Sequence, residues 1–231
     1  MWRLVLRHLP DDLGVIWMER RGRGGSGRGE EYVDFNAEVD DVLAVAALLE
    51  PGAVLVAHSI GAVIALEALR RDSTPFAGAV LCEPPVPVDD LPTPGRSEML
   101  AALDDGRNDA AVEAWLRRSV CMDEAAVEAF KASPAWPRAL ETIWTMRREG
   151  EARQRLHPAD DRYSRVGIPV RLLLGTETDA HHKESIRLLE RQLPDCRTVI
   201  LEGQGHGAHV TAPDLVAGAV VELIRELDEP A

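Results

Sequence analysis

The residue best suited to chemistry is Ser59, which lies where an apolar run meets a helical pattern. Residues 53–57 read Ala-Val-Leu-Val-Ala, and apolar residues at helical spacing follow from Ile60. The junction at 57–61 is Ala-His-Ser-Ile-Gly, and its small residues are expected to let strand and helix backbones approach closely. Such a turn exposes the serine hydroxyl and points the Ile60 N–H toward a developing oxyanion. The sequence therefore predicts a nucleophile, with a helix N-cap as the alternative role of this serine.

A serine nucleophile needs a general base, and His206 is the candidate among seven histidines. It lies in Glu-Gly-Gln-Gly-His-Gly at 202–207, after the last predicted strand and before the last predicted helix. Glycines on both sides are expected to let this loop hold the imidazole over the sheet edge. His209 is the competitor nearby and is expected to play a supporting part. The remaining histidines are predicted to be structural or exposed: His8, His58, His157, His181 and His182.

Two carboxylates compete to orient His206, as the acid of a catalytic triad does. Asp179 follows the predicted strand 170–174 in the sequence Gly-Thr-Glu-Thr-Asp, and Glu83 follows the predicted strand 78–82. Pro84 is expected to hold Glu83 in an extended backbone, which would fix the direction of its side chain. Glu83 is favoured and Asp179 stays the alternative. The carboxylate that does not orient the histidine is expected to be a solvated loop residue.

A mostly parallel α/β sheet would position these residues. Short apolar runs alternate with helical patterns, as a parallel sheet covered on both faces requires. The predicted strands are 14–18, 53–57, 78–82, 170–174 and 198–201. Helices are expected over 2–9, from about Asp34, over 184–193 and over 213–227. The apolar stretch 53–69 contains charged and polar residues, so it is interpreted as a buried strand and helix instead of a membrane span.

The stretch 86–164 differs from the rest of the chain. It starts within a proline-rich segment, 84–94, and then shows helical patterns without a strand signal at 99–103, 110–120, 125–130 and 138–146. We predict a helical cap inserted between two strands, above the carboxyl edge of the sheet. Residues 1–85 and 165–231 would then form the core.

Composition narrows the function classes. The 231 residues include 26 basic and 39 acidic side chains, a net charge of −13, which argues against a nucleic-acid partner and favours a small-molecule substrate. Three scattered cysteines, Cys82, Cys121 and Cys196, argue against a disulfide scaffold and a zinc site. No metal, cofactor or membrane partner is expected, and the N-terminal residues contain no secretory signal. A cytoplasmic location is expected, and the oligomeric state is not predicted.

Together these motifs resemble the α/β-hydrolase family over nearly the whole chain. Residues 20–27, Arg-Arg-Gly-Arg-Gly-Gly-Ser-Gly, are similar to the family's Asp-x-Arg-Gly-x-Gly-x-Ser loop, with Glu19 where aspartate is usual. Residues 56–61 and 205–213 are similar to its nucleophile and histidine motifs. The resemblance implies that the acid commonly occupies the position of Thr178, and that some relatives, such as haloalkane dehalogenases, keep it at the position of Glu83.

The resemblance also implies a strand and a His-Gly loop upstream of residue 2, which would supply a second oxyanion donor. The strand would normally lie between 14–18 and 53–57. Three explanations are open: the start at Met1 lies downstream of the true one, residues 2–6 serve as the strand, or the protein is a degraded relative. Loss of one oxyanion donor lowers turnover by about 10²–10³, so the third explanation predicts a feeble enzyme.

The sequence thus predicts a serine hydrolase that acts on a small ester-like substrate through an acyl-enzyme. The alternative is a catalytically weak or inactive protein of the same fold that binds a ligand or a partner. A dinucleotide fingerprint is also formally present, since Gly22, Gly24 and Gly27 have the spacing and Asp41 lies 19 residues after the first. We reject it because 28–33 is polar and Asp41 falls within a predicted helix.

Overall fold

The computed structural model describes residues 2–27, 35–88, 95–156 and 161–229. The expected helix start at Asp34, the histidine at His157 and part of the proline-rich segment 84–94 lie outside the described residues. None of the helices in the described ranges is both long and apolar enough to cross a membrane.

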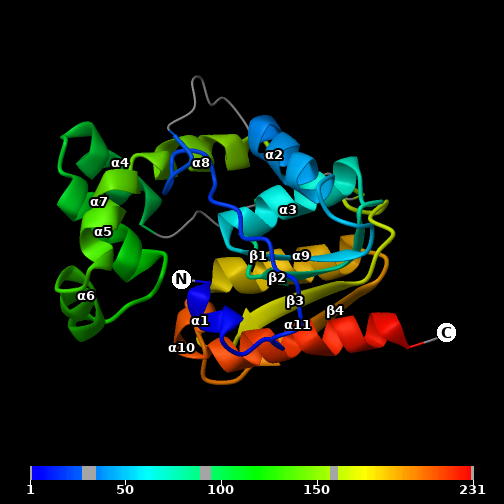
Figure 1. The fold of residues 1–231 in the computed structure, drawn as a ribbon. Helices are drawn as coiled ribbons and strands as arrows, with labels where there is room; N and C mark the ends of the chain where they lie inside the picture. The colour runs from blue at the N-terminus through cyan, green and yellow to red at the C-terminus, as the bar shows by residue number, and fades with distance from the viewer. Residues whose placement is uncertain (1, 28–34, 89–94, 157–160, 230–231) are drawn as a thin grey trace.

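In the described part of the chain, four strands form one parallel sheet in the order β1-β2-β3-β4 (Figure 1). They are β1 (Ala53–His58), β2 (Phe76–Cys82), β3 (Val170–Gly175) and β4 (Cys196–Leu201). Four of the five predicted strands and the parallel α/β class are thereby confirmed. Since the strands are parallel, all carboxyl ends meet at one edge of the sheet, and the residues that follow them are brought together there.

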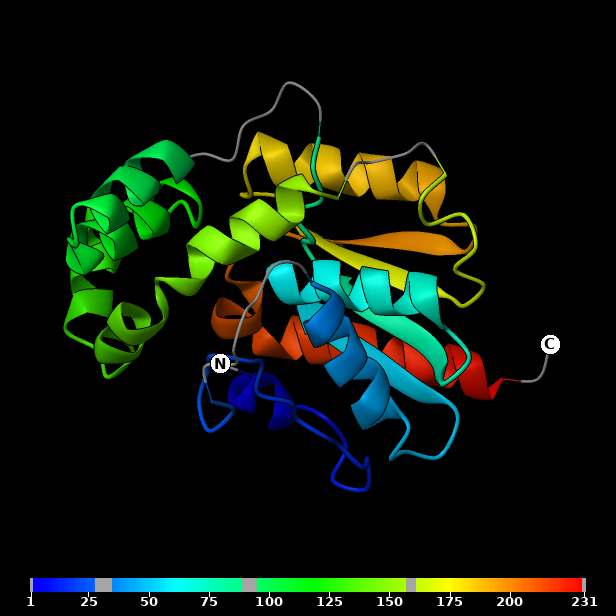
Figure 2. The ribbon, with the colours of Figure 1, turned by 90° about the horizontal axis from the view of Figure 1, so that it is seen from above.

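Helices cover both faces of the sheet (Figures 1 and 2). One face is covered by α2 (Asn36–Ala46), α3 (Ile60–Arg71) and α9 (Ala180–Gln192), and the other by α1 (Arg3–Leu6), α10 (Ala208–Thr211) and α11 (Pro213–Asp228). Alternate residues of β1 face opposite sides of the sheet. Leu55 packs in the apolar cluster that contains the buried residues of α3, whereas Val54 and Val56 pack in the cluster that contains those of α11. The strand β1 is apolar at consecutive positions because both of its faces are covered by helices.

Among the described residues, five helices lie between β2 and β3 and extend away from the sheet (Figure 2). They are α4 (Arg96–Asp104), α5 (Asn108–Arg118), α6 (Glu124–Lys131), α7 (Ala135–Thr142) and α8 (Thr145–Gln154). Their buried residues, among them Met99, Val112 and Val127, form an apolar cluster of their own. The prediction of one helix over 138–146 is wrong, because the chain turns at Ile143, whose side chain is buried in this cluster. The division of the chain into core and cap stays a prediction.

The predicted strand 14–18 is not a strand in the structure. Its central residues are exposed: Val15 by 48%, Ile16 by 52% and Trp17 by 41%. An extended segment becomes a strand only when a neighbour accepts its backbone hydrogen bonds. No described segment occupies the place between 14–18 and β1 that the family resemblance assigns to another strand. Residues 3–6 form α1, so the suggestion that 2–6 supplies that strand is also wrong.

Ion pairs hold the glycine-rich loop 20–27 against α2 and α8. Glu149 of α8 is 2% exposed and accepts from Arg20 at 3.0 Å and Arg23 at 2.6 Å. Burial alone would raise the pKa of Glu149, but the charges of these arginines lower it below its usual value. Asp41 lies inside α2 and pairs with Arg21 at 2.6 Å, away from any strand end, which agrees with the rejection of a dinucleotide site.

Candidate active site

Ser59 occupies a strained turn between β1 and α3. Its backbone angles are φ 54° and ψ −129°, a region that non-glycine residues rarely adopt. The Ser59 N–H donates to the carbonyl oxygen of Cys82 at 2.8 Å, which ties the turn to β2. Ser59 is the N-cap residue of α3 by position, but its side chain makes no capping bond, so its hydroxyl is not used to cap the helix. Such strain is maintained by surrounding structure and is typical of functional sites.

The small residues around Ser59 are not all required by packing. A Cβ atom added at Gly61 would meet no atom within 4 Å. The expectation that both flanking positions must be small is therefore wrong for Gly61, where the structure has room for a side chain. No acceptor among the described residues bonds to the Ile60 N–H, which stays available at the N-terminus of α3.

Three residues from three loops are joined by hydrogen bonds at the sheet edge. The Oγ of Ser59 lies 2.9 Å from Nε2 of His206, and Nδ1 of His206 lies 2.7 Å from Oε2 of Glu83. An ionised carboxylate only accepts, so Nδ1 of His206 carries the proton and donates it to this bond. Nε2 therefore holds the lone pair and accepts from the Ser59 hydroxyl. The arrangement can raise the nucleophilicity of Ser59.

Glu83 is buried, with 4% of the residue exposed. Its carboxylate also accepts from the Gly175 N–H at 2.8 Å and from the Thr178 hydroxyl at 2.9 Å. Burial alone would raise its pKa, but hydrogen bonds and the nearby His206 lower it below its usual value. The expected extended backbone is wrong, because φ of Glu83 is 44°. The three bonds to its carboxylate hold this strained conformation.

Asp179 is placed differently. Its carboxylate accepts from the His182 N–H at 3.1 Å as the N-cap of α9, and lies 2.7 Å from Nδ1 of the same imidazole. Burial alone would raise its pKa, but the bond to His182 lowers it to about 2. The structure thus brings Glu83, and not Asp179, into contact with His206. The expectation that the second carboxylate is solvated is wrong, since Asp179 forms a pair of its own.

The loop that carries His206 is fixed by a close backbone contact. A Cβ atom added at Gly175, the last residue of β3, would collide with the carbonyl oxygen of Gln204. The Glu177 N–H donates to that same carbonyl oxygen at 2.9 Å. The close approach of the two backbones therefore requires the glycine at the end of β3, Gly175, and not the glycines beside His206. Burial lowers the pKa of His206 below its usual value, although Glu83 opposes this shift.

Sequence reasoning missed the part played by His58. Its Nε2 lies 2.7 Å from the His206 carbonyl oxygen, which can only accept, so His58 donates. Burial, with His206 and His209 nearby, lowers the pKa of His58 well below its usual value and keeps the ring neutral at pH 7. The ring centroid of His209 lies 4.1 Å from that of His58, with the planes tilted by 41°, and burial lowers the pKa of His209 to about 4. The adjacency of His58 to Ser59 was the signal available in the sequence.

Sequence reasoning also missed His182, whose ring centroid lies 4.3 Å from that of His206. The available signal was its position three residues after Asp179, a spacing that joins an N-cap side chain to the first helical turn.

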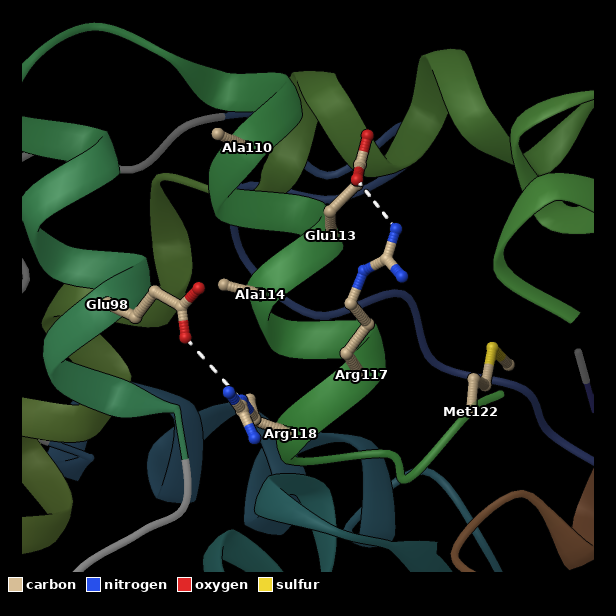
Figure 3. A pocket seen from close by; sticks show the side chains of 7 residues that line it. All are labelled: Glu98, Ala110, Glu113, Ala114, Arg117, Arg118 and Met122. Atoms are coloured by element: carbon tan, nitrogen blue, oxygen red, sulfur yellow. Dashed lines mark hydrogen bonds and ion pairs between the residues drawn. The ribbon is translucent and has the colours of Figure 1, made fainter. Parts of the chain in front are cut away.

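Cys121 and Met122 follow α5 in the chain. Burial raises the pKa of the Cys121 thiol, and the charges of Asp179 and Glu83 add to the shift. A surface hollow of about 470 Å³ lies beside the neighbouring Met122 (Figure 3). Its charged groups are already paired, Arg117 with Glu113 at 3.0 Å and Arg118 with Glu98 at 3.6 Å. None of the triad residues lines it, so it is not part of the candidate site.

Comparison with known proteins agrees with this fold. The sequence matches the alpha/beta hydrolase family over residues 1–219. No curated protein matches it significantly. An alpha/beta hydrolase from Sphaerobacter thermophilus DSM 20745 is 27% identical with a TM-score of 0.73, over 89% of this chain and 80% of that one.

Two further solved structures are similar in fold alone. MGS-M2, an alpha/beta hydrolase enzyme from a Medee basin deep-sea metagenome library, is 16% identical with a TM-score of 0.76, over 92% of this chain and 80% of that one. The meta-cleavage product hydrolase CumD is 21% identical with a TM-score of 0.68, over 97% of this chain and 84% of that one. Because the family match spans nearly the whole chain, the protein belongs to the alpha/beta hydrolase family.

Proposed function

We propose that the protein is a serine hydrolase that cleaves a small ester-like substrate through an acyl-enzyme. The observation that carries the proposal is the continuous hydrogen-bonded path from Ser59 through His206 to Glu83, with distances of 2.9 Å and 2.7 Å. A serine in a strained elbow supports the same conclusion, since the turn leaves its hydroxyl partly exposed at the sheet edge.

In the proposed reaction, the Oγ of Ser59 attacks the substrate carbonyl while Nε2 of His206 takes the hydroxyl proton. Glu83 holds Nδ1–H and stabilises the imidazolium that forms. The Ile60 N–H donates to the oxyanion. The imidazolium then gives its proton to the leaving alcohol, and an acyl-enzyme remains on Ser59. Water, deprotonated by His206, releases the acid and restores the serine.

The helices α4–α8 are proposed to shape the substrate pocket. The effect of the Asp179 and Glu83 charges on the pKa of the Cys121 thiol supports this, because Cys121 follows α5 in the chain. Solved structures of similar fold include proteins described as a meta-cleavage product hydrolase and a deformylase, so the fold alone does not specify the substrate. An ester is proposed here because a neutral serine–histidine pair suits acyl transfer.

The test is labelling of the purified protein with a fluorophosphonate probe, together with turnover of p-nitrophenyl acetate. Ser59→Ala is expected to abolish both, whereas Ser164→Ala, which removes an exposed serine, is expected to retain both. Circular dichroism checks that each variant is folded. Equal labelling of wild type and Ser59→Ala would reject the proposed nucleophile. A folded wild type that neither reacts nor turns over would favour the ligand-binding alternative.

A further inference from the structure

A second histidine–carboxylate pair lies beside the first. The ring of His182 is 4.3 Å from that of His206, with 37° between their planes, and Asp179 holds Nδ1 of His182 at 2.7 Å. The proposed acyl transfer does not use His182. One ligating atom each of Glu83, His182 and His206 lies within 4.8 Å of the others. Two imidazoles and a carboxylate thus lie close enough together to be considered as ligands of one ion.

The bond to Asp179 decides which nitrogen of His182 is available. An ionised carboxylate only accepts, so Nδ1 of His182 carries the proton and Nε2 holds the lone pair. Within the described residues, Nε2 of His182 makes no hydrogen bond. Histidines that bind metals are commonly held in this way, with a carboxylate on the nitrogen away from the ion. Glu83 is also held in place, by Gly175 and Thr178.

We infer that Glu83, His182 and His206 form an inhibitory site for a divalent transition metal of the zinc type. Imidazole nitrogen and carboxylate oxygen are ligands that Zn²⁺ accepts, and three protein ligands leave a fourth position for water. Tetrahedral ligands about 2.1 Å from zinc lie about 3.4 Å apart, so shifts of about 1 Å in these side chains complete the site. The ligands come from three separate segments, which explains why no motif in the sequence predicts them.

The inhibition follows from the position of the metal. The ion replaces the proton that Nδ1 of His206 shares with Glu83, and that proton moves to Nε2 of the same imidazole. The ring stays neutral with one N–H, but Nε2 now faces Ser59 as a donor and cannot accept the hydroxyl proton. The inhibitory effect rests on the proposed function, whereas the binding of the metal does not.

The test is calorimetric titration of the full chain with ZnCl₂. Wild type is expected to bind one Zn²⁺, and His182→Gln is expected to bind it at least about tenfold more weakly, since it loses a direct ligand. Asp179→Asn keeps a residue that caps α9 and is expected to weaken binding by about 10–100-fold. His8→Ala, which removes an exposed histidine, is the matched control and is expected to bind like wild type. In parallel, Zn²⁺ should inhibit turnover of p-nitrophenyl acetate, with reversal by EDTA.

The outcomes separate the two proposals. Equal Zn²⁺ affinity of wild type, His182→Gln and Asp179→Asn, or no binding by any of them, overturns the metal site. Binding that depends on His182 in a protein without turnover supports the metal site and rejects the hydrolase. Turnover that Zn²⁺ does not inhibit, in a protein that binds it through His182, overturns the inhibitory role.

Discussion

The hydroxyl of Thr178 donates to Oε2 of Glu83 at 2.9 Å, the same oxygen that accepts from His206. The family resemblance places the acid most often at the position of Thr178, so here the residue at that position holds Glu83, the proposed acid, which follows β2. The two positions are therefore neighbours in space, although they lie 95 residues apart in the chain. We therefore expect an acid at either position to reach Nδ1 of the same imidazole.

The first prediction concerns the transfer of the acid between these positions. Glu83→Gln is expected to lower kcat by about 10³–10⁴, because an amide favours the wrong imidazole tautomer. The double variant Glu83→Gln/Thr178→Asp is expected to have a kcat at least about tenfold higher than Glu83→Gln alone, which corresponds to about 1.4 kcal/mol. Turnover of p-nitrophenyl acetate measures both, and Glu177→Gln is the exposed control. Wild-type turnover in Glu83→Gln would contradict the role of this carboxylate.

The second prediction concerns the bond from His58 to the His206 carbonyl oxygen. His58→Phe keeps a ring but leaves that oxygen without its donor, and a small displacement of a catalytic group can cost about 10²-fold. We expect kcat to fall by about 10–100-fold with little change in KM. His58→Gln restores an N–H donor and should recover part of the loss. Equal kcat for the Phe and Gln variants would show that the hydrogen bond is not what positions His206.

The third prediction concerns the contact between Gly175 and the backbone of Gln204. Gly175→Ala forces the 202–207 loop to move, since the added methyl group would meet a carbonyl oxygen that cannot rotate away. Overpacking of this kind costs about 1–3 kcal/mol, so both the melting temperature and kcat should fall. Gly207→Ala is the matched control, because its added Cβ meets no atom within 4 Å. If both variants behaved like wild type, the loop would be adjustable and the close approach unimportant.

The sequence was sufficient to predict the residues of the proposed triad but not their surroundings. Ser59, His206 and Glu83 each follow a predicted strand, and in a parallel sheet such positions meet at one edge. The choice between Glu83 and Asp179 depended on side-chain direction, which strand patterns do not specify. His58 and His182 act through contacts with residues far along the chain, so local patterns left their positions open.

The error at 14–18 has a different origin. An apolar, β-branched run predicts a strand from its own residues, but a strand also requires a bonded neighbour. The exposed Val15, Ile16 and Trp17 show that the local pattern was present without such a neighbour in the described residues. The residue pattern of a single segment does not reveal whether a neighbouring strand is present to pair with it.

A buried carboxylate away from the site links α3 to the segment that leads into β3. Glu67 is 5% exposed and accepts from Arg162 at 2.7 Å and 2.8 Å, and from the Tyr163 hydroxyl at 2.9 Å. Burial alone would raise the pKa of Glu67, but the bonds and charge of Arg162, with the Tyr163 hydroxyl, lower it below its usual value. The ionised form is therefore favoured by folding.

The fourth prediction concerns how the stability of the protein depends on pH through the ion pair of Glu67 and Arg162. A carboxyl group whose pKa is lower in the folded state stabilises the fold above its unfolded pKa of about 4.3, and this contribution is lost as the pH falls through the folded value. Glu67→Gln leaves Arg162 without its counter-charge and is expected to lower the free energy of unfolding by about 3 kcal/mol at pH 7. The difference in the free energy of unfolding between the variant and wild type should shrink below about pH 4, where wild type also loses the charge of Glu67.

Urea unfolding between pH 3 and pH 7 measures this difference. The control is Glu202→Gln, which removes an exposed carboxylate and should show the same pH dependence of stability as wild type. A constant difference at every pH would assign the loss to packing and not to the charge of Glu67.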